Sequence, residues 1–251
     1  MGSVVVAYSG GLDSTFLLKV ASIVLPRGNT LAVTAASEIH PRDELNFAKK
    51  ISRSFGIRHK IIRTNELSDA SFVKNTPQRC FYCKNKLFVK LQDIASRNNI
   101  KFVVDATNLS DAKDFRPGRI ALKRLGIRSP LKEAGMDKED IRALSRQMRL
   151  ETWDKPAFAC LASRIPYGIK ITPAILRRID KAEACLKRAG FRQVRLRHHL
   201  KLCRIEVEKE KIPLLIKKRQ MLVEKLKALG YNYITADLEG YRTGSFNEVL
   251  K

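Results

Sequence analysis

Positions 9–14, Ser-Gly-Gly-Leu-Asp-Ser, carry the residue types and order that bind the phosphates of a nucleotide. Two adjacent glycines let backbone amides approach an anion without an intervening Cβ atom. A helix that begins directly after them would add unpaired N–H groups and the positive end of its dipole. An aspartate beside phosphates is a suitable ligand for Mg²⁺. The candidate nucleotide-binding residues are therefore Ser9, Gly10, Gly11, Leu12, Asp13 and Ser14, with Asp13 as the candidate magnesium ligand.

The flanking residues predict a strand, a tight turn and a helix around this motif. A β-branched apolar run at 3–8 precedes it, and apolar residues recur at helical spacing over 14–24. The spacing excludes a Walker A loop, which requires a lysine after its second glycine. An ordinary strand–helix turn is the alternative, but strand, glycines, acid and helix in this order favour the phosphate site.

Strands and helices alternate through the first half of the sequence. Strands are expected at 3–8, 30–36, 58–63 and 101–105, and helices at 14–24, 42–55, 84–98 and 138–148. This alternation predicts an α/β fold with a parallel sheet covered on both faces. Ligands of such sheets bind beyond the carboxyl ends of the strands. Asp105 and Asn108 follow the last of these strands, so they are expected beside the motif at 9–14.

The remaining chain predicts long loops and then a smaller α+β domain. Residues 106–137 and 151–171 are expected to be irregular and functional. Thr172 and Pro173 form a helix start, and half-buried strands should follow around 194–207. A helix at 211–229 and a strand at 231–237 complete this unit. We expect a nucleotide-binding domain at 1–165 and an α+β domain for substrate binding or oligomerisation at 166–251.

The composition is that of a globular chain with a strong positive charge. The 251 residues are 44% hydrophobic, and the net charge is +24. Such a surplus attracts nucleotides, pyrophosphate or nucleic acid, although a lysine-rich solvated surface is the alternative. Aromatic residues make up 7% of the chain, which disfavours a base-stacking platform. No apolar run approaches the ~20 residues of a membrane span. Residues 1–3 leave no room for a signal peptide, so we expect a cytoplasmic protein.

Cys160 is the candidate catalytic nucleophile. It lies in a loop bounded by proline and glycine, with Lys155 and Arg164 within five residues of it. Neighbouring cations would stabilise a thiolate and make the sulfur more nucleophilic. A buried structural cysteine is the alternative, because Ala159 and Leu161 flank it. Five cysteines in a cytoplasmic chain indicate metal binding or catalysis rather than a disulfide framework.

Cys80 and Cys83 form a pair with the spacing common to iron–sulfur and zinc sites. A structural zinc site would need further ligands, and the spare cysteines fit poorly. Cys185 falls in a predicted helix, and Cys203 alternates with apolar residues of a predicted strand, so both are assigned to the core. A thioredoxin-like redox pair is disfavoured because the flanking pattern differs from that fold.

The sequence resembles the LarE family of ATP-dependent sacrificial sulfur transferases, within the superfamily of PP-loop ATP pyrophosphatases. Residues 9–14 are similar to the PP-loop itself. Further matching runs are 79–84 (Arg-Cys-Phe-Tyr-Cys-Lys), 105–108 (Asp-Ala-Thr-Asn), 116–118 (Arg-Pro-Gly), 128–131 (Arg-Ser-Pro-Leu), 152–168 (from Thr-Trp-Asp-Lys-Pro-Ala to Ile-Pro-Tyr-Gly) and 237–242 (Asp-Leu-Glu-Gly-Tyr-Arg). Because these runs span nearly the whole chain, the resemblance is specific to the LarE family.

The resemblance implies an adenine nucleotide α-hydrolase-like fold and a reaction in two stages. ATP with Mg²⁺ adenylylates a carboxylate of a pyridinium biscarboxylate mononucleotide in nickel-pincer cofactor synthesis, and pyrophosphate leaves. Sulfur then arrives by one of two routes. In the sacrificial route, Cys160 displaces AMP as a thioester and ends as dehydroalanine. In the other, Cys80, Cys83 and Cys160 hold a [4Fe-4S] cluster whose open iron carries hydrosulfide. The Cys-x-x-Cys pair favours the cluster.

Further site residues follow from the resemblance. Ser163 and Arg164 of the 152–168 run are candidates for nucleotide binding, and Arg195 and Arg197 for contact with a substrate phosphate near a subunit interface. Arg116 and Arg128 would neutralise phosphate charge. The alternatives are loop solvation for the last two and ion pairing with Glu206 and Glu208 for Arg195 and Arg197. The resemblance also implies a homo-oligomer, a hexamer as in the family.

Two other classes of protein remain as alternatives. A tRNA thiolase would share the PP-loop and suit the net charge, but the sequence contains no recognisable RNA-binding module. A nucleotide-binding regulatory protein would not need both Asp13 and Cys160. We therefore expect a small-molecule substrate, and neither nucleic acid nor a membrane as partner.

Overall fold

The computed structural model describes residues 1–113, 117–156 and 159–250. The chain divides by its internal contacts into two compact units. The first unit comprises Met1–Glu66 and Pro77–Phe158, and the second comprises Leu67–Thr76 and Ala159–Lys251. The short segment Leu67–Thr76 therefore packs with a part of the chain that lies far from it in sequence.

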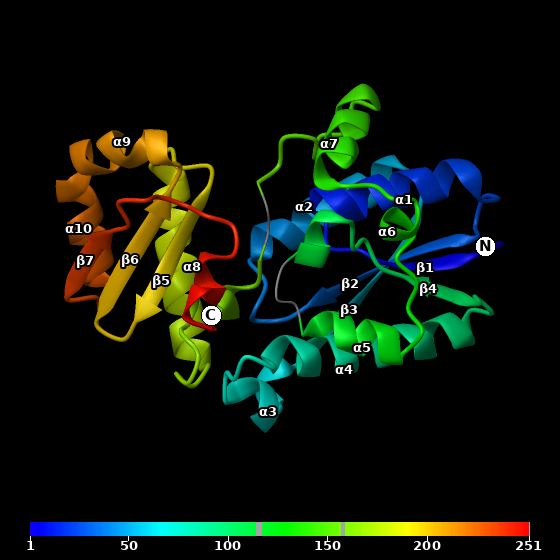
Figure 1. Ribbon diagram of the computed structural model, residues 1–251, viewed down its shortest axis with the longest axis horizontal. Coiled ribbons are helices and arrows are strands. Elements are labelled where there is room, and N and C mark those ends of the chain that lie inside the picture. Colours follow the sequence, from blue (N-terminus) through cyan, green and yellow to red (C-terminus); the bar gives the residue numbers. More distant parts are fainter. Residues whose placement is uncertain (114–116, 157–158, 251) are drawn as a thin grey trace. The chain divides into compact units, whose positions relative to one another are not determined.

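The first unit is built on a parallel sheet with the strand order β3-β2-β1-β4 (Figure 1). Its strands are β1 (Val4–Ala7), β2 (Thr30–Ala36), β3 (Arg58–Arg63) and β4 (Phe102–Val104). Its helices are α1 (Leu12–Val24), α2 (Arg42–Ser54), α4 (Arg79–Arg97), α5 (Gly118–Arg124), α6 (Pro130–Glu133) and α7 (Lys138–Gln147), with the 3₁₀ turn η2 (Ser110–Lys113). The predicted α/β fold with a parallel sheet is confirmed.

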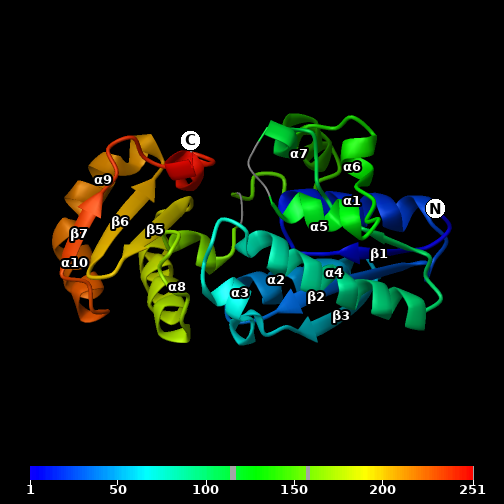
Figure 2. The same cartoon turned by 60° about the horizontal axis from the view of Figure 1, so that its bottom comes forward.

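Helices cover both faces of this sheet (Figures 1 and 2). On one face, Val4 and Val6 share a buried core with α1, α6 and α7. On the other face, Val5 packs with buried side chains of α4 and α5. Successive residues of a strand point to opposite faces, so β1 must be apolar at every position to serve both cores. That requirement explains the uninterrupted run of valines in the sequence.

The strand order creates a switch point between β1 and β4. The chain moves from β1 to β2 and β3 in one direction, and β4 then pairs with the opposite side of β1. Helices on opposite faces diverge at such a point, which leaves room for a ligand beyond the carboxyl ends of the strands. The turn after β1 and the segment after β4 both begin there.

The second unit has its own sheet, with the order β5-β6-β7. The first two of these strands are antiparallel and the last pair is parallel. Its elements are η1 (Glu66–Ser68, which begins at the unit boundary), α3 (Ala70–Val73), η3 (Leu161–Arg164), α8 (Pro173–Arg188), β5 (Val194–His199), β6 (Leu202–Val207), η4 (Lys209–Lys211), α9 (Ile212–Lys217), α10 (Arg219–Ala228), β7 (Tyr233–Ala236) and η5 (Ser245–Leu250). The predicted start of α8 is confirmed, because the Thr172 hydroxyl accepts a hydrogen bond from the Ile175 amide.

Some predicted elements differ from the observed ones. The stretch 106–137, predicted as irregular, contains α5 and α6, which are too short to show a clear helical period. The helix predicted at 211–229 is interrupted at Lys218, whose Nζ donates to the Ala189 carbonyl at 2.7 Å. α4 begins at Arg79 rather than at 84, which places Cys80 and Cys83 within its first five residues. Over the described ranges, no helix is long and apolar enough to cross a membrane.

Asn75 holds Leu67–Thr76 within the second unit. It is buried and has a positive φ of 54°. Its Nδ2 atom donates to the carbonyls of Ile165 at 3.2 Å, Pro166 at 2.8 Å and Ile169 at 2.9 Å. Asparagine tolerates the left-handed region better than most residues. One side chain therefore fixes the loop that follows η3.

Replacing this side chain should destabilise the protein. Asn75→Ala should lower the free energy of unfolding by about 2–3 kcal/mol, because buried carbonyls lose their donor and alanine disfavours a positive φ. Asn75→Gly keeps the backbone conformation accessible, so it should lose less than alanine does. Denaturant unfolding measures both. An Asn75→Ala variant as stable as the wild type would contradict this role.

Candidate active site

The turn after β1 is closed by its own side chains. The Ser9 and Ser14 hydroxyl oxygens lie 3.0 Å apart, and the Gly11 amide donates to Ser9 Oγ at 3.4 Å. Gly10 has a φ of 73°, and a Cβ atom there would lie 3.0 Å from Cβ of Ala48 in α2. A larger residue would therefore be strained on two counts. No side chain in the described part of the chain caps the start of α1, so its first amides remain available to an anion.

Asp13 stands in the first turn of α1 and is linked to the segment after β4. Asn108 Nδ2 donates to Asp13 Oδ1 at 3.1 Å. Burial raises the pKa of Asp13; the positive charge of Lys138 opposes this effect, and the Asp111 carboxylate adds to it. Two carboxylates that repel each other beside a phosphate turn are a donor set suited to Mg²⁺. The residues present therefore fit a magnesium ion.

Asp105 organises the segment after β4. It is buried, and its two carboxylate oxygens accept hydrogen bonds from the hydroxyls of Thr107 and Ser129, each at 2.5 Å. Lys84 Nζ of α4 lies 3.9 Å from Asp105 Oδ2. Because protein hydroxyls occupy its oxygens, Asp105 holds Thr107 and Ser129 in place at the end of the sheet. The sequence analysis did not identify either hydroxyl as functional. Thr107 lies in the 105–108 run and Ser129 in the 128–131 run, so the similarity of these runs to the family was the signal that could have found them.

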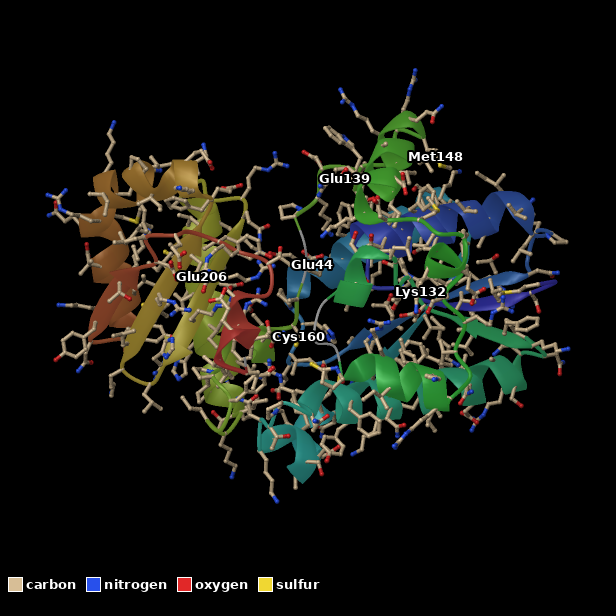
Figure 3. All side chains as sticks on the ribbon, viewed as in Figure 1. Glu44, Lys132, Glu139, Met148, Cys160 and Glu206 are labelled. Carbon is tan, nitrogen blue, oxygen red and sulfur yellow. The ribbon has the colours of Figure 1, made fainter. Side chains whose placement is uncertain are left out.

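Lys155 joins the phosphate turn to α2. Its Nζ atom donates to the Gly10 carbonyl at 2.9 Å and to Glu44 Oε2 at 2.7 Å. It also lies 3.8 Å from the ring centroid of Phe47. The structure places Lys155 at the phosphate turn, a position that the sequence analysis did not assign to it. Figure 3 shows Glu44 on α2. The signal in the sequence that could have pointed to a functional role for Lys155 is its position in the 152–168 run.

The cysteines fall into an accessible and a buried group. Cys80, Cys83 and Cys160 are partly exposed, whereas Cys185 of α8 and Cys203 of β6 are buried. Burial raises the pKa of Cys203 to about 12, so it is a thiol at neutral pH. All five, each within the described residues, are free of disulfide bonds. The assignment of the last two to the core agrees with their burial.

The accessible cysteines belong to different units. Cys80 and Cys83 are three positions apart near the start of α4, and so lie on one face of that helix in the first unit. Cys160 directly precedes η3 in the second unit (Figure 3). Among the described residues, no group of three or more His, Cys, Asp or Glu side chains could hold a metal ion.

Ser163 and Arg164 fix the backbone around Cys160. The Cys160 carbonyl accepts from Ser163 Oγ at 2.7 Å and from Arg164 Nη1 at 3.0 Å. Arg164 also forms a buried bidentate pair with Glu183 of α8, at 2.9 and 3.0 Å. Burial opposes ionisation of Glu183, but the charge and hydrogen bonds of Arg164, together with the Leu196 amide and the charge of Arg195, outweigh burial and lower the pKa of Glu183. These contacts define the loop conformation that presents the Cys160 side chain.

Arg195 and Arg197 are buried in the second unit, on a strand that was expected to be half-buried. Arg197 pairs with Glu206 of β6 at 2.7 and 2.8 Å, and its Nη1 donates to the Ser163 carbonyl at 2.9 Å (Figure 3 labels Glu206). Ion pairing, the alternative considered for this strand, is therefore present at Arg197. The Arg195 guanidinium lies 5.1 Å from the ring centroid of Tyr241, and burial followed by the charge of Arg164 lowers its pKa.

The remaining candidates have surface or structural partners. Arg128 pairs with Glu133 at the surface, and Arg116 lies outside the described residues. His198 is buried beside Tyr231, and burial lowers the pKa of His198 to about 4, so it is neutral at physiological pH.

Comparisons with known proteins identify the chain. Residues 1–105 match the family model for NAD synthase. The chain is 37% identical to the pyridinium-3,5-bisthiocarboxylic acid mononucleotide synthase of Lactiplantibacillus plantarum, over 98% of this chain and 90% of that protein. It is 41% identical to an uncharacterised protein of Synechocystis, over 98% of this chain and 92% of that protein. It is 27% identical to an uncharacterised protein of Methanocaldococcus jannaschii, over 96% of this chain and 91% of that protein.

A parallel sheet with a glycine turn and an acidic helix start at its switch point defines a PP-loop protein that uses ATP. Within that class, the chain belongs to the LarE family of pyridinium-3,5-bisthiocarboxylic acid mononucleotide synthases, and it is an ATP-dependent sulfurtransferase.

The buried pair beside Cys160 yields a stability prediction. Glu183→Gln should lower the free energy of unfolding by about 3 kcal/mol, because it leaves the Arg164 charge buried without a counterion. Glu151→Gln is the matched control. The side chains of Glu151 and its partner Lys50 are both exposed, so their ion pair should contribute less than about 1 kcal/mol to the free energy of unfolding.

The same pair should be visible in the pH dependence. Because the pKa of Glu183 is lowered in the folded state, its stabilisation is present above the unfolded pKa. It is lost as the pH falls through the lower, folded value. Denaturant unfolding between pH 7 and 3 should therefore show a steeper acid loss for the wild type than for Glu183→Gln. Parallel curves would contradict the assignment.

Proposed function

We propose that this protein uses ATP to insert sulfur into the ring carboxylates of a pyridinium biscarboxylate mononucleotide, a step in nickel-pincer cofactor synthesis. The observation that carries the proposal is the full-length similarity to a relative named for the bisthiocarboxylic acid product. The geometry of the phosphate turn supports the use of ATP for this purpose.

The first stage is activation of a carboxylate. A carboxylate resists nucleophiles because oxide is a poor leaving group. A substrate carboxylate oxygen attacks the α-phosphorus of ATP, the bond from that phosphorus to the bridging oxygen breaks, and pyrophosphate leaves. Amides of the first turn of α1 would bind the departing pyrophosphate, and Asp13 would hold Mg²⁺ beside it. Magnesium supplies charge neutralisation of the phosphates.

The second stage replaces AMP by sulfur. If Cys160 is the donor, its thiolate attacks the activated carbonyl carbon, AMP leaves, and a thioester forms. A base then removes the cysteine α-proton, the Cβ–S bond breaks, and the product thiocarboxylate departs, leaving dehydroalanine at position 160. The partial exposure of Cys160 at the start of η3 makes it accessible to a substrate.

The other route uses a [4Fe-4S] cluster with Cys80, Cys83 and Cys160 as ligands. Two observations support this proposal: Cys80, Cys83 and Cys160 are the partly exposed cysteines of the described residues, and the first two share one helix face. When bound, such a cluster offers an open iron at which hydrosulfide can be held. We favour this route because the sacrificial one gives Cys80 and Cys83 no role. Membership of the family further supports a hexameric assembly and a cytoplasmic location.

Asp13→Asn should abolish pyrophosphate release while leaving the fold intact. The amide keeps the shape of the side chain and its bond with Asn108, but it is a poor ligand for Mg²⁺, so release should fall roughly a hundredfold or more. Pyrophosphate release from MgATP and the biscarboxylate mononucleotide measures the loss, and circular dichroism confirms the fold. Asp93→Asn, on the exposed face of α4, is the matched control. Unchanged release in Asp13→Asn would remove Asp13 from the metal role.

Iron and acid-labile sulfide should decide between the two sulfur routes. Anaerobically purified protein should contain about four irons and four sulfides per chain, and Cys80→Ala should lose them. Cys185→Ala, at a buried position, should retain both. If iron is absent from ATP-binding protein, and intact mass after turnover shows position 160 lighter by one H₂S, the sacrificial route is correct instead.

A further inference from the structure

The ammonium group of Lys155 is held at the phosphate turn by three neighbours. Its Nζ atom donates to the Gly10 carbonyl at 2.9 Å and to Glu44 Oε2 at 2.7 Å, and it lies 3.8 Å from the ring centroid of Phe47. Glu44 and Phe47 are one turn apart on α2, so one helix face fixes the position of the cation. The side chains of Lys155 and Glu44 are both largely buried. The proposed function gives Lys155 no role.

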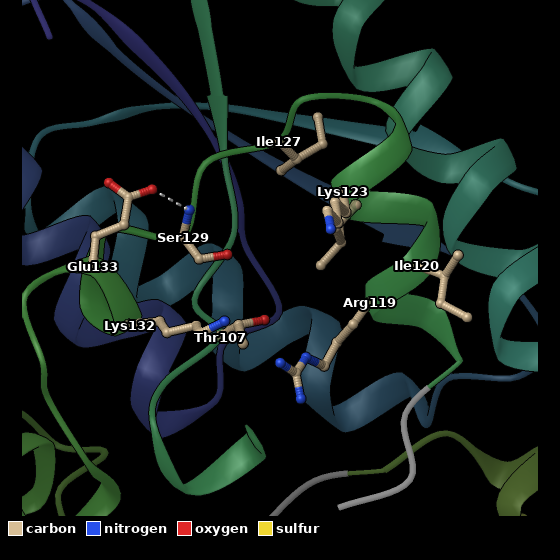
Figure 4. A pocket seen from close by; sticks show the side chains of 9 residues that line it. Thr107, Arg119, Ile120, Lys123, Ile127, Ser129, Lys132 and Glu133 are labelled. Atoms are coloured by element: carbon tan, nitrogen blue, oxygen red, sulfur yellow. Dashed lines mark hydrogen bonds between the residues drawn. The ribbon is translucent and has the colours of Figure 1, made fainter. Parts of the chain in front are cut away.

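The charge of Lys155 acts on groups of the protein. Lys132 of α6 provides a contrast, because it lines a cavity of about 550 Å³ and extends into it, where a ligand could reach its charge (Figure 4). Lys155 instead directs two of its three N–H donors at a carboxylate and a backbone carbonyl. Hydrogen bonds from a charged donor are stronger than neutral ones. The Gly10 carbonyl is therefore held firmly.

The bond from Lys155 fixes the plane of the Gly10–Gly11 peptide. This peptide is trans, so the Gly10 carbonyl oxygen and the Gly11 amide hydrogen point in opposite directions. Gly10 packs on α2, where an added Cβ atom would lie 3.0 Å from Cβ of Ala48. Lys155 is itself held by α2, so it keeps the carbonyl oxygen on that side of the turn. The Gly11 N–H consequently faces away from α2.

A peptide between two glycines needs such a restraint. Neither residue has a Cβ atom to oppose rotation of the peptide plane. Half a turn would exchange the two groups and place the Gly10 carbonyl oxygen where the Gly11 N–H now is. Phosphate-binding turns present N–H groups to the anion, and a carbonyl oxygen on that side would repel it. The unrotated peptide is therefore the form that can bind ATP.

We propose that Lys155 is a positioning residue for ATP, which keeps the Gly10 carbonyl turned away from the phosphates. Glu44 and Phe47 hold the ammonium group in place for this purpose. The inference rests on the use of ATP in the proposed function. Lys155 lies 145 positions after Gly10, so a distant loop supplies the restraint that the two glycines lack. Preorganisation of the turn lowers the cost of binding the nucleotide.

The variant Lys155→Met tests the proposal in the full chain. Methionine keeps an apolar side chain beside Phe47 but cannot donate to the carbonyl, so calorimetry should show MgATP binding at least about tenfold more weakly than to the wild type. The factor should change by less than about twofold between low and high salt, because the ammonium group does not contact phosphate. Lys155→Arg, which still donates, should recover most of the affinity. Lys50→Met, in an exposed pair on the same helix, is the matched control and should bind MgATP like the wild type.

A second variant protects the test against misfolding. Lys155→Met/Glu44→Gln removes both charges of the buried pair, so no carboxylate is left without its partner. It should bind MgATP no more weakly than Lys155→Met, because Glu44 acts through Lys155. Circular dichroism confirms that each variant is folded.

The outcomes separate this inference from the proposed function. Unchanged MgATP affinity in a folded variant without Lys155 overturns the inference, and so does a Lys155→Arg variant as weak as Lys155→Met. A loss that disappears at high salt also overturns it, because the ammonium group would then contact the phosphates directly. If the wild type still releases pyrophosphate with the biscarboxylate mononucleotide in those cases, the proposed function stands. If Lys155 governs MgATP affinity but the wild type releases no pyrophosphate, the positioning role stands and the proposed activity fails.

Discussion

The parallel pairing of β1 between β2 and β4 is the constraint on which the first unit depends. β1 contributes to cores on both sides of the sheet, so helices must cover both faces. Because β2 and β4 flank β1 on opposite sides, their connections diverge at its carboxyl end. The phosphate turn, Asp13 and Asn108 meet at that divergence. The site is thus a consequence of strand order, and the apolar strands hold it rigidly.

Carboxylates hold both candidate sites in shape through their hydrogen bonds. In the first unit, Asp105 fixes the hydroxyls of Thr107 and Ser129, and Glu44 fixes Lys155 against the Gly10 carbonyl. In the second unit, Glu183 and Glu206 balance buried arginines that bond to the backbone around Cys160 and Ser163. The chain has a net charge of +24, so acidic partners for its arginines are few. Each buried carboxylate is therefore important, because a buried guanidinium without a carboxylate partner would strongly destabilise the fold. Part of the positive charge of this chain is therefore structural.

The distribution of cysteines fits a division of labour between the units. The nucleotide turn and the Cys80–Cys83 pair belong to the first unit, whereas Cys160 belongs to the second. Activation of a carboxylate and delivery of sulfur are chemically separate stages, because the acyl adenylate must form before a sulfur nucleophile can displace AMP. Cys185 and Cys203 are buried and therefore out of reach of a substrate, and burial also raises the pKa of the Cys203 thiol.

Local patterns in the sequence were sufficient to predict the α/β fold, the turn after the first strand and the division between accessible and core cysteines. A valine run, two glycines and an acid in order specify strand, turn and helix start without reference to distant residues. Tertiary structure decided which distant side chains meet. Lys155 pairs with Glu44, Arg197 is buried against Glu206, and Asn75 bonds to a loop some ninety residues later in the chain. Such contacts depend on how strands and helices pack, and no periodicity along the chain records that packing.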